Sequence, residues 1–204
     1  MDKTPSYFNA PTPLPTSQSA RFPTCRCSDR GAKTPNSPRG TISTVDRIRQ
    51  WYHYDSDVRC PYLDVLVGLP TEVRLQDRGA SYPSLQEIHV DVLVAYLWWF
   101  DYVPNDPVGE YLPLNGRNQS PDALRDLTTK IDSVVFGFLD GLTEPDLARD
   151  LVCHFPSDTG LTLEKFPLED VLWHTVEEEL PHRGELNALR WQSDIEPPIP
   201  GRDD

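Results

Sequence analysis

The 204-residue chain is poor in cysteine and lysine and contains no long apolar run. Its four cysteines are Cys25, Cys27, Cys60 and Cys153. They are too few and too scattered for a disulfide framework, so reduced thiols in a cytoplasmic protein are expected. A zinc site at Cys25-Arg26-Cys27 is not favoured, because no second ligand pair has a matching spacing.

Membrane segments are also missing from the sequence. No stretch approaches the roughly 18 continuous apolar residues of a membrane-spanning helix, and the first residues lack the apolar core of a secretory signal. No membrane association is therefore expected.

Charge is unevenly distributed along the chain. Residues 1–40 contain seven of the 21 prolines and carry six Lys or Arg against two Asp or Glu, a net charge of +4. Because the whole chain carries −13, residues 41–204 carry −17, from 13 basic and 30 acidic residues. This negative charge repels phosphate groups. Neither nucleic acid nor an anionic membrane is therefore an expected partner.

The same division predicts a disordered, basic Pro/Ser/Thr-rich tail over 1–40 and a folded domain over 41–204. Two alternatives for the tail stay open. Its Arg, Ser and Thr content is also typical of an organelle transit peptide, and translation beginning near Val45 would make the tail an artefact of start assignment. Mass spectrometry of the native N-terminus distinguishes these cases.

Four segments of the folded part have apolar residues at helical spacing. They run from about Thr44 to Leu66, from Ser84 to Val103, from Pro121 to Gly141, and from Pro167 or Leu168 to Trp191. Pro61 predicts a kink or a break near Asp57–Cys60 in the first of them. Pro181 predicts a local kink in the last.

Between the third and fourth helices the periodicity changes. Residues 151–155 and 161–166 are rich in apolar and β-branched side chains and flank the turn-forming segment 156–160. They predict either a short β-hairpin or two extended segments. The expected fold is therefore all-α, a four-helix bundle with this small insert before the last helix.

The last helix carries a stripe of potential metal ligands. His174, Glu178 and His182 follow the spacing i, i+4, i+8, which places them on one face. Glu178 and His182 can bind one ion, whereas His174 lies about 12 Å from His182 along the axis and is a fourth or alternative ligand. His89 on the second helix supplies a third ligand if it faces this stripe.

Two histidines and one carboxylate with open positions are typical of a reactive metal site. The alternative is an exposed acidic face with two surface histidines, and a core histidine at position 89. Gly184 indicates close approach of another backbone or of a ligand, since glycine in a helix costs about 1 kcal/mol relative to alanine. Arg183 has several alternative roles. It orients an anionic group in a reactive site, or it is structural and pairs with Glu179 or hydrogen-bonds Asn187 or a loop carbonyl.

From about Thr41 to Pro198 the chain resembles the DinB/YfiT-like superfamily of proposed metalloenzymes. The resemblance is carried by three motifs. They are Leu69-Pro70, then Ser84-Leu85-Gln86-Glu87-Ile88-His89 opening a helix, and Trp173-His174-(x3)-Glu178-(x3)-His182-Arg183-Gly184-Glu185-Leu186.

The resemblance implies a four-helix bundle, often a homodimer, with a divalent metal bound by one residue of the second helix and two of the last. These positions fall on His89, Glu178 and His182. Glu178 stands where the family usually has His, and Glu185 where it often has Gln. The harder ligand set favours manganese, iron or zinc over nickel.

Some relatives resemble transferases or isomerases that use low-molecular-weight thiols such as mycothiol or bacillithiol. The resemblance therefore implies a metal-dependent enzyme of thiol-transferase or detoxification type, or a hydrolase, acting on a small molecule. No catalytic residue is assigned. The second interpretation is a metal-binding or metal-free bundle that acts through protein contacts in a stress response. The Trp98-Trp99 pair indicates either a dimer face or an internal aromatic cluster.

Overall fold

The structure is a computed structural model that describes residues 42–105, 116–157 and 160–198. The predicted tail 1–40, with Cys25 and Cys27, lies outside the described residues.

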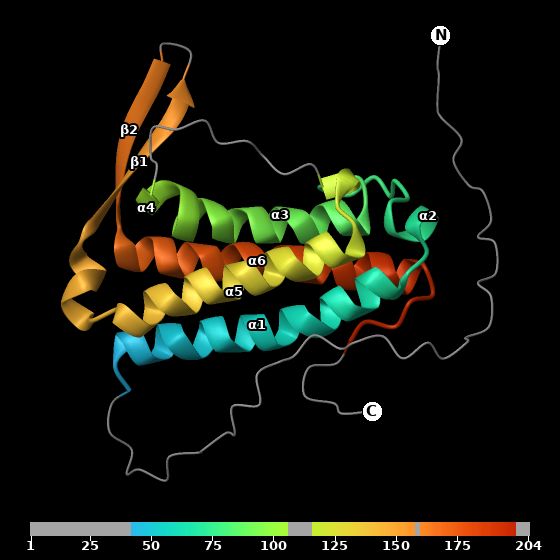
Figure 1. Cartoon of the computed structure of the whole chain (residues 1–204), viewed down its shortest axis with the longest axis horizontal. Coiled ribbons are helices and arrows are strands. Elements are labelled where there is room, and N and C mark those ends of the chain that lie inside the picture. Colours follow the sequence, from blue (N-terminus) through green and yellow to red (C-terminus); the bar gives the residue numbers. More distant parts are fainter. Residues whose placement is uncertain (1–41, 106–115, 158–159, 199–204) are drawn as a thin grey trace.

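Four long helices form an all-α bundle, as the sequence predicts (Figure 1). They are α1 (Thr44–Gly68), α3 (Leu85–Leu97), α5 (Pro121–Gly141) and α6 (Leu168–Gln192). Helix α3 packs against α5 and α6, and α1 also packs against both. Short helical segments join them: α2 (Thr71–Arg74), the π-helix η1 (Trp98–Tyr102), α4 (Val103–Asn105), and the 3-10 helices η2 (Gly116–Asn118) and η3 (Glu144–Ala148).

Serine side chains cap the N-termini of three of the long helices. Ser43, Ser84 and Ser120 each accept a hydrogen bond from the backbone amide three residues on, at 3.1, 3.3 and 3.1 Å. Each bond satisfies an amide that has no partner inside the helix. Helix α6 begins after Pro167 without such a cap, and acidic Glu169 and Asp170 lie in its first turn, where they complement the helix dipole.

Both internal prolines are accommodated without ending their helices. Helix α1 continues through Pro61, so the break considered near Asp57–Cys60 does not occur, and α6 continues through Pro181. Each proline deprives one carbonyl, that of Asp57 or Glu177, of its helical bond. Both of these residues are exposed, so water can take the missing bond.

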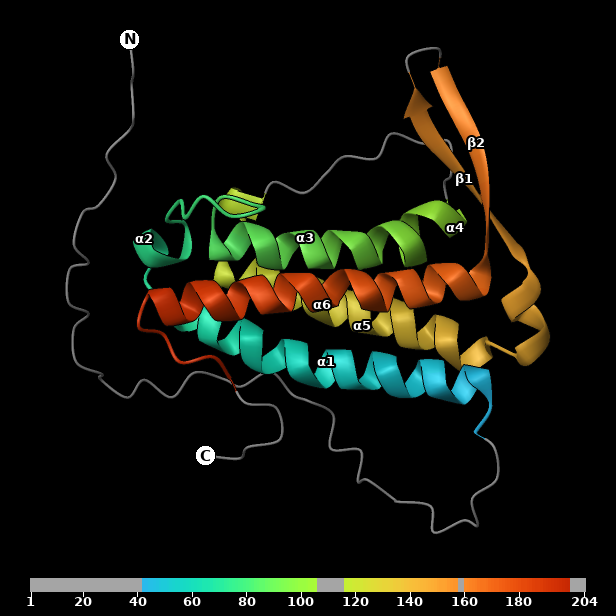
Figure 2. The ribbon, with the colours of Figure 1, turned by 180° about the vertical axis from the view of Figure 1, so that it is seen from behind.

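The insert before the last helix is an antiparallel β-hairpin. Strand β1 (Asp150–Ser157) pairs with β2 (Gly160–Pro167), with Asp150 opposite Pro167 and Ser157 opposite Gly160. The hairpin projects from one end of the bundle beside α4, and β2 leads directly into α6 (Figure 2). Of the two predicted alternatives, the hairpin is confirmed.

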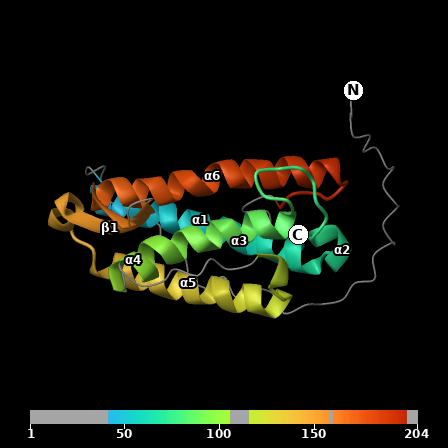
Figure 3. The same ribbon diagram turned by 90° about the horizontal axis from the view of Figure 1, so that it is seen from above.

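The apolar core is divided into two clusters along the bundle axis. The cluster toward the hairpin includes Ile48, Leu93, Phe100, Ile131 and Leu172. The cluster at the opposite end, where α2 lies (Figure 3), includes Leu63, Leu66, Leu85, Leu124 and Leu186. Buried polar residues lie between them, because Asp55 falls between Tyr52 and Val58 on α1 and Glu179 falls between Val176 and Leu186 on α6.

The two adjacent tryptophans pack within the chain. The Trp98 ring stacks on Tyr102 with a centroid distance of 4.6 Å. The Trp99 ring meets His174 edge-on at 5.9 Å. These contacts fit the internal aromatic cluster, and a dimer stays a prediction. In the described ranges, no helix combines the length and the apolarity needed to cross a bilayer.

Gly184 lies in open space rather than against another element. Among the described residues, a Cβ built on it meets no atom within 4 Å outside the backbone of its own helix, so the expected close approach of another backbone is wrong. Gly184→Ala should therefore raise the free energy of unfolding by about 0.5–1 kcal/mol, since alanine loses less backbone freedom on folding. Urea unfolding measures this change.

Gly116→Ala provides the contrast, because its Cβ would lie 3.1 Å from the Glu87 Cα. It should lower the free energy of unfolding. A Gly184→Ala protein no more stable than the wild type would contradict the open environment of this glycine.

Candidate functional site

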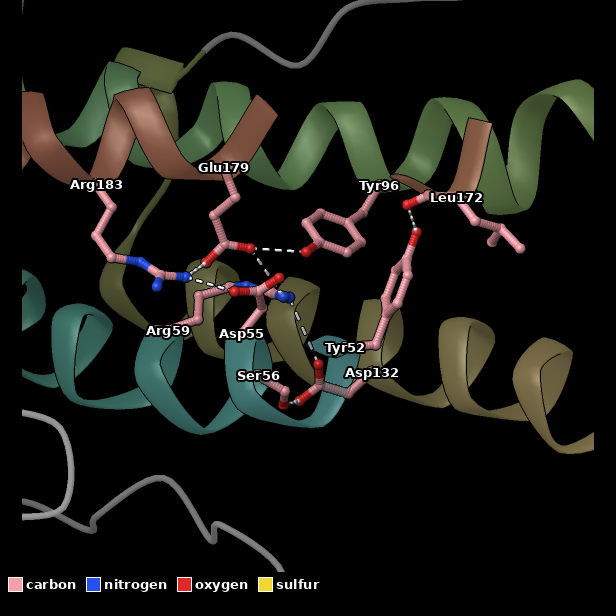
Figure 4. Close-up of polar contacts among 9 residues, drawn as sticks. All are labelled: Tyr52, Asp55, Ser56, Arg59, Tyr96, Asp132, Leu172, Glu179 and Arg183. Carbon is pink, nitrogen blue, oxygen red and sulfur yellow. Dashed lines mark hydrogen bonds and ion pairs between the residues drawn. The ribbon is translucent and has the colours of Figure 1, made fainter. Parts of the chain in front are cut away.

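A layer of buried charged side chains crosses the middle of the bundle (Figure 4). Asp55 and Arg59 come from successive turns of α1, and Glu179 and Arg183 from successive turns of α6, so each pair lies on one helix face. Arg183 Nη2 lies 2.8 Å from Asp55 Oδ1 and 2.9 Å from Glu179 Oε1. Arg59 Nη2 donates to Glu179 Oε2 at 3.3 Å.

The other two helices complete this layer. The Tyr96 hydroxyl on α3 donates to Glu179 Oε2 at 2.7 Å, and the Arg59 guanidinium lies 4.2 Å from the Tyr96 ring centroid. Asp132 on α5 is 3.5 Å from Arg59 Nη1 and accepts a hydrogen bond from Ser56 at 3.0 Å. All four long helices thus contribute to one polar network.

Asp55 is fully buried, whereas Asp132 of the same layer is partly exposed. The Oδ2 of Asp55 is buried and has no hydrogen-bond partner among the described residues. Burial, together with the neighbouring Glu179 carboxylate, raises the pKa of Asp55 to about 6, although Arg183 acts in the opposite sense. The layer contains two arginines and three carboxylates. When Asp55 is protonated, the layer as a whole is therefore formally neutral.

His89 lies in the core beside this layer. Its imidazole lines a cavity of about 20 Å³ together with Arg59, Glu179 and Arg183, and the apolar part of the wall is Tyr62, Val92 and Leu186. His89 is 2% exposed, and its Nε2 has no partner within the described part of the chain. Burial first, and then the nearby Arg59 and Arg190, lower the pKa of His89 to about 3, so the imidazole is neutral at pH 7.

His182 has a different set of neighbours, at the seam between α3 and α6. Its Nε2 lies 3.3 Å from Asp91 Oδ2, and its Nδ1 lies 3.7 Å from Glu185 Oε2. The Tyr82 ring centroid is 6.0 Å from that of His182. The hydrogen bond of Tyr82 to Asp91, and then burial, raise the pKa of Tyr82 to about 12.

Glu178 is paired with His174 one turn before it. Their Oε2 and Nε2 atoms are 2.7 Å apart, and both side chains are partly exposed. The three predicted ligands thus have different partners: His89 lines the cavity, His182 meets Asp91, and Glu178 meets His174. No three His, Cys, Asp or Glu side chains of the described residues are grouped as a metal ion requires. The predicted ligand set is not assembled in this conformation.

Asp91 is the α3 residue that meets His182, and sequence reasoning missed it. It follows His89 by two positions, and residues so spaced on a helix point to different faces. His89 is buried, whereas Asp91 is partly accessible at the seam. The only sequence signal for Asp91 as a partner of His182 was its position within one turn of the predicted ligand His89.

For Arg183, the predicted pairing with Glu179 is confirmed. Asn187 instead accepts a hydrogen bond from the Tyr62 hydroxyl. The second partner of Arg183, Asp55, was visible in the sequence only as a polar residue on the apolar face of the first helix.

Comparison with known proteins supports the fold. No family model matches the chain, and no curated protein matches it. Among solved structures, the chain is similar to a DinB-like protein from Bacillus cereus ATCC 10987, with a TM-score of 0.55 and 17% sequence identity. The similarity covers 78% of this chain and 98% of that one. The bundle therefore has the DinB-like fold.

Glu179→Gln should lower the free energy of unfolding by about 3 kcal/mol, because it removes the buried carboxylate that Arg59 and Arg183 share and leaves each arginine with one charged partner. Glu177→Gln is the matched control, since Glu177 is exposed two residues away on the same helix. It should change the free energy of unfolding by less than about 0.5 kcal/mol. Equal effects in urea unfolding would contradict the central role of Glu179.

Asp55→Asn and His89→Gln should alter the pH dependence of stability in opposite senses. The raised pKa of Asp55 means that the folded chain binds its proton more tightly, so this residue adds stability as pH falls through about 6. The pKa of His89 falls from 6.5 to about 3 on folding, so this residue removes stability as pH falls through 6.5.

Between pH 7 and pH 5, each effect amounts to about 1–2 kcal/mol. Asp55→Asn should therefore lose more stability than the wild type over this range, and His89→Gln should lose less. Urea unfolding at pH 7, 6 and 5 measures the slopes, and three parallel profiles would contradict the assignment.

Proposed function

We propose that this DinB-like bundle is a metal-dependent enzyme, and that a divalent transition metal such as zinc, nickel, manganese or iron binds at the seam between α3 and α6. The observation that carries the proposal is the pair of Asp91 Oδ2 and His182 Nε2, 3.3 Å apart across the two helices. Two ligands of one ion lie about 3 Å apart, because each is about 2.0–2.2 Å from the metal. The pair therefore fits a shared cation.

Glu178 is the proposed third ligand. It lies one turn before His182 on the same helix, so its carboxylate can turn from His174 toward the seam. His89 is the competing third ligand from α3. The cavity that His89 lines is also lined by Arg59 and Arg183, whose positive charges repel a cation. The donor set Asp91, Glu178 and His182 is the better fit.

The surrounding residues orient this donor set. Glu185 lies at the second ring nitrogen of His182, the position from which a carboxylate fixes a ligand imidazole. The Ser81 amide donates to Glu185 at 2.7 Å, so the segment before α3 is tied to α6. Tyr82, from the same segment, hydrogen-bonds Asp91 and flanks the His182 ring.

When bound, a metal of this kind lowers the pKa of a coordinated thiol and supplies a thiolate at neutral pH. We propose a low-molecular-weight thiol as co-substrate and an electrophilic small molecule as its acceptor. The second candidate function is a non-enzymatic bundle that acts through protein contacts. It is favoured by Arg183, which bonds Asp55 and Glu179 of its own core instead of extending toward a substrate.

Metal content by mass spectrometry tests the ligand set. After loading with Zn²⁺ or Ni²⁺, the wild type should hold one ion per chain. His182→Ala and Asp91→Asn should bind at least about tenfold more weakly, which is the loss that outer-shell partners alone produce. His89→Gln should bind as the wild type does.

Loss of metal in His89→Gln but not in Asp91→Asn would restore His89 as the α3 ligand. Equal metal content in the wild type and His182→Ala would remove the metal proposal. Turnover of an electrophilic aryl halide with added thiols separates the two functions. A wild-type rate no higher than that of His182→Ala would favour the non-enzymatic bundle.

A further inference from the structure

Two residues that line the cavity between α1, α3 and α6 carry buried polar atoms without partners in the described part of the chain. His89 Nε2 and Arg59 Nε are buried, and neither has a hydrogen-bond partner within the described ranges. The two side chains are 2% and 4% exposed, so bulk water does not solvate them. Leaving such a group unpaired costs about 1–3 kcal/mol. A ligand that bonds both atoms is therefore stabilised in the cavity.

The size of the cavity limits this ligand. A volume of about 20 Å³ admits one water-sized group, because one such group requires about 10–15 Å³ on the same measure. The apolar side of the wall, formed by Val92, Leu186 and the Tyr62 ring, restricts polar contacts to the opposite side.

The charges around the cavity exclude an ionic ligand. A cation would meet the guanidinium groups of Arg59 and Arg183. An anion would meet the Glu179 carboxylate, and an ion of either sign would lose its hydration on entering so small a cavity. Neither charge gains from entering. The ligand is therefore a neutral group.

A hydroxyl group has the required chemistry. It accepts a hydrogen bond from the Arg59 Nε–H, and it also bonds His89 Nε2 in either tautomer of the imidazole, because it both donates and accepts. We propose that this cavity is a hydroxyl-binding site between His89 and Arg59. The hydroxyl group that it binds belongs either to a single water molecule or to a small alcohol. The site is separate from the metal proposal and does not depend on it.

Arg183 is the most exposed residue of the cavity wall, and we place the opening of the site there. Its side chain is 14% exposed, whereas each other residue of the wall is at most 5% exposed. Exchange with solvent therefore passes Arg183, which is bound to Asp55 and Glu179. A hydroxyl group held behind these bonds exchanges slowly.

Magnetic relaxation dispersion, which counts long-lived water molecules, tests the site on the full chain. Val92→Ile adds a methyl group to the cavity wall and should remove one long-lived water. Val90→Ile is the matched control, because Val90 is buried on the same helix but does not line the cavity. It should retain the wild-type number. The same count in all three proteins would overturn the proposal.

Two measurements on the wild type need no variant. A cross-relaxation peak between water and the His89 ring protons is expected in the NMR spectrum, and its absence would overturn the proposal. Methanol and chloride are then added separately. Shifts of the His89 ring nitrogens with methanol identify an alcohol as a second source, and no response to methanol leaves water as the hydroxyl bound. Shifts with chloride alone would show an anion site and overturn the proposal.

Discussion

The arrangement of the bundle depends on the carboxylate of Glu179. One of its oxygens accepts from Arg183, and the other accepts from Tyr96 and Arg59. These bonds join α1, α3 and α6 at one level of the core. A buried ion pair adds little net stability over an apolar pair, but removing one partner is costly. The Glu179 carboxylate therefore holds the three helices together at one level of the core, between the two apolar clusters.

The fold was largely predictable from the sequence because its signals are local. The caps at Ser84 and Ser120 and the helical spacing of apolar residues fix where α3 and α5 begin. The change of periodicity at residues 151–166 correctly indicated the hairpin. The continuity of α1 through Pro61 was not predictable. It depends on packing on both sides of the proline, and packing is not a local property.

The candidate site was only partly predictable. His182 lies at an interhelical contact, as its spacing from Glu178 indicated, but its partner on α3 is Asp91. Spacing places a residue on a helix face, whereas the partner it meets depends on the rotation of the neighbouring helix. The buried layer was missed for a related reason. Asp55 lies among the apolar positions of α1, and only the three-dimensional structure shows that Arg183 of α6 pairs with it.

The charged layer also determines how the core responds to temperature. Hydration of charged groups has a strongly negative entropy, so it becomes less favourable on heating. The free energy lost by withdrawing Asp55, Arg59, Glu179 and Arg183 from water therefore decreases as temperature rises, while the hydrophobic gain per unit area levels off. The unfavourable desolvation free energy of this layer is therefore smaller at higher temperature than at 25 °C.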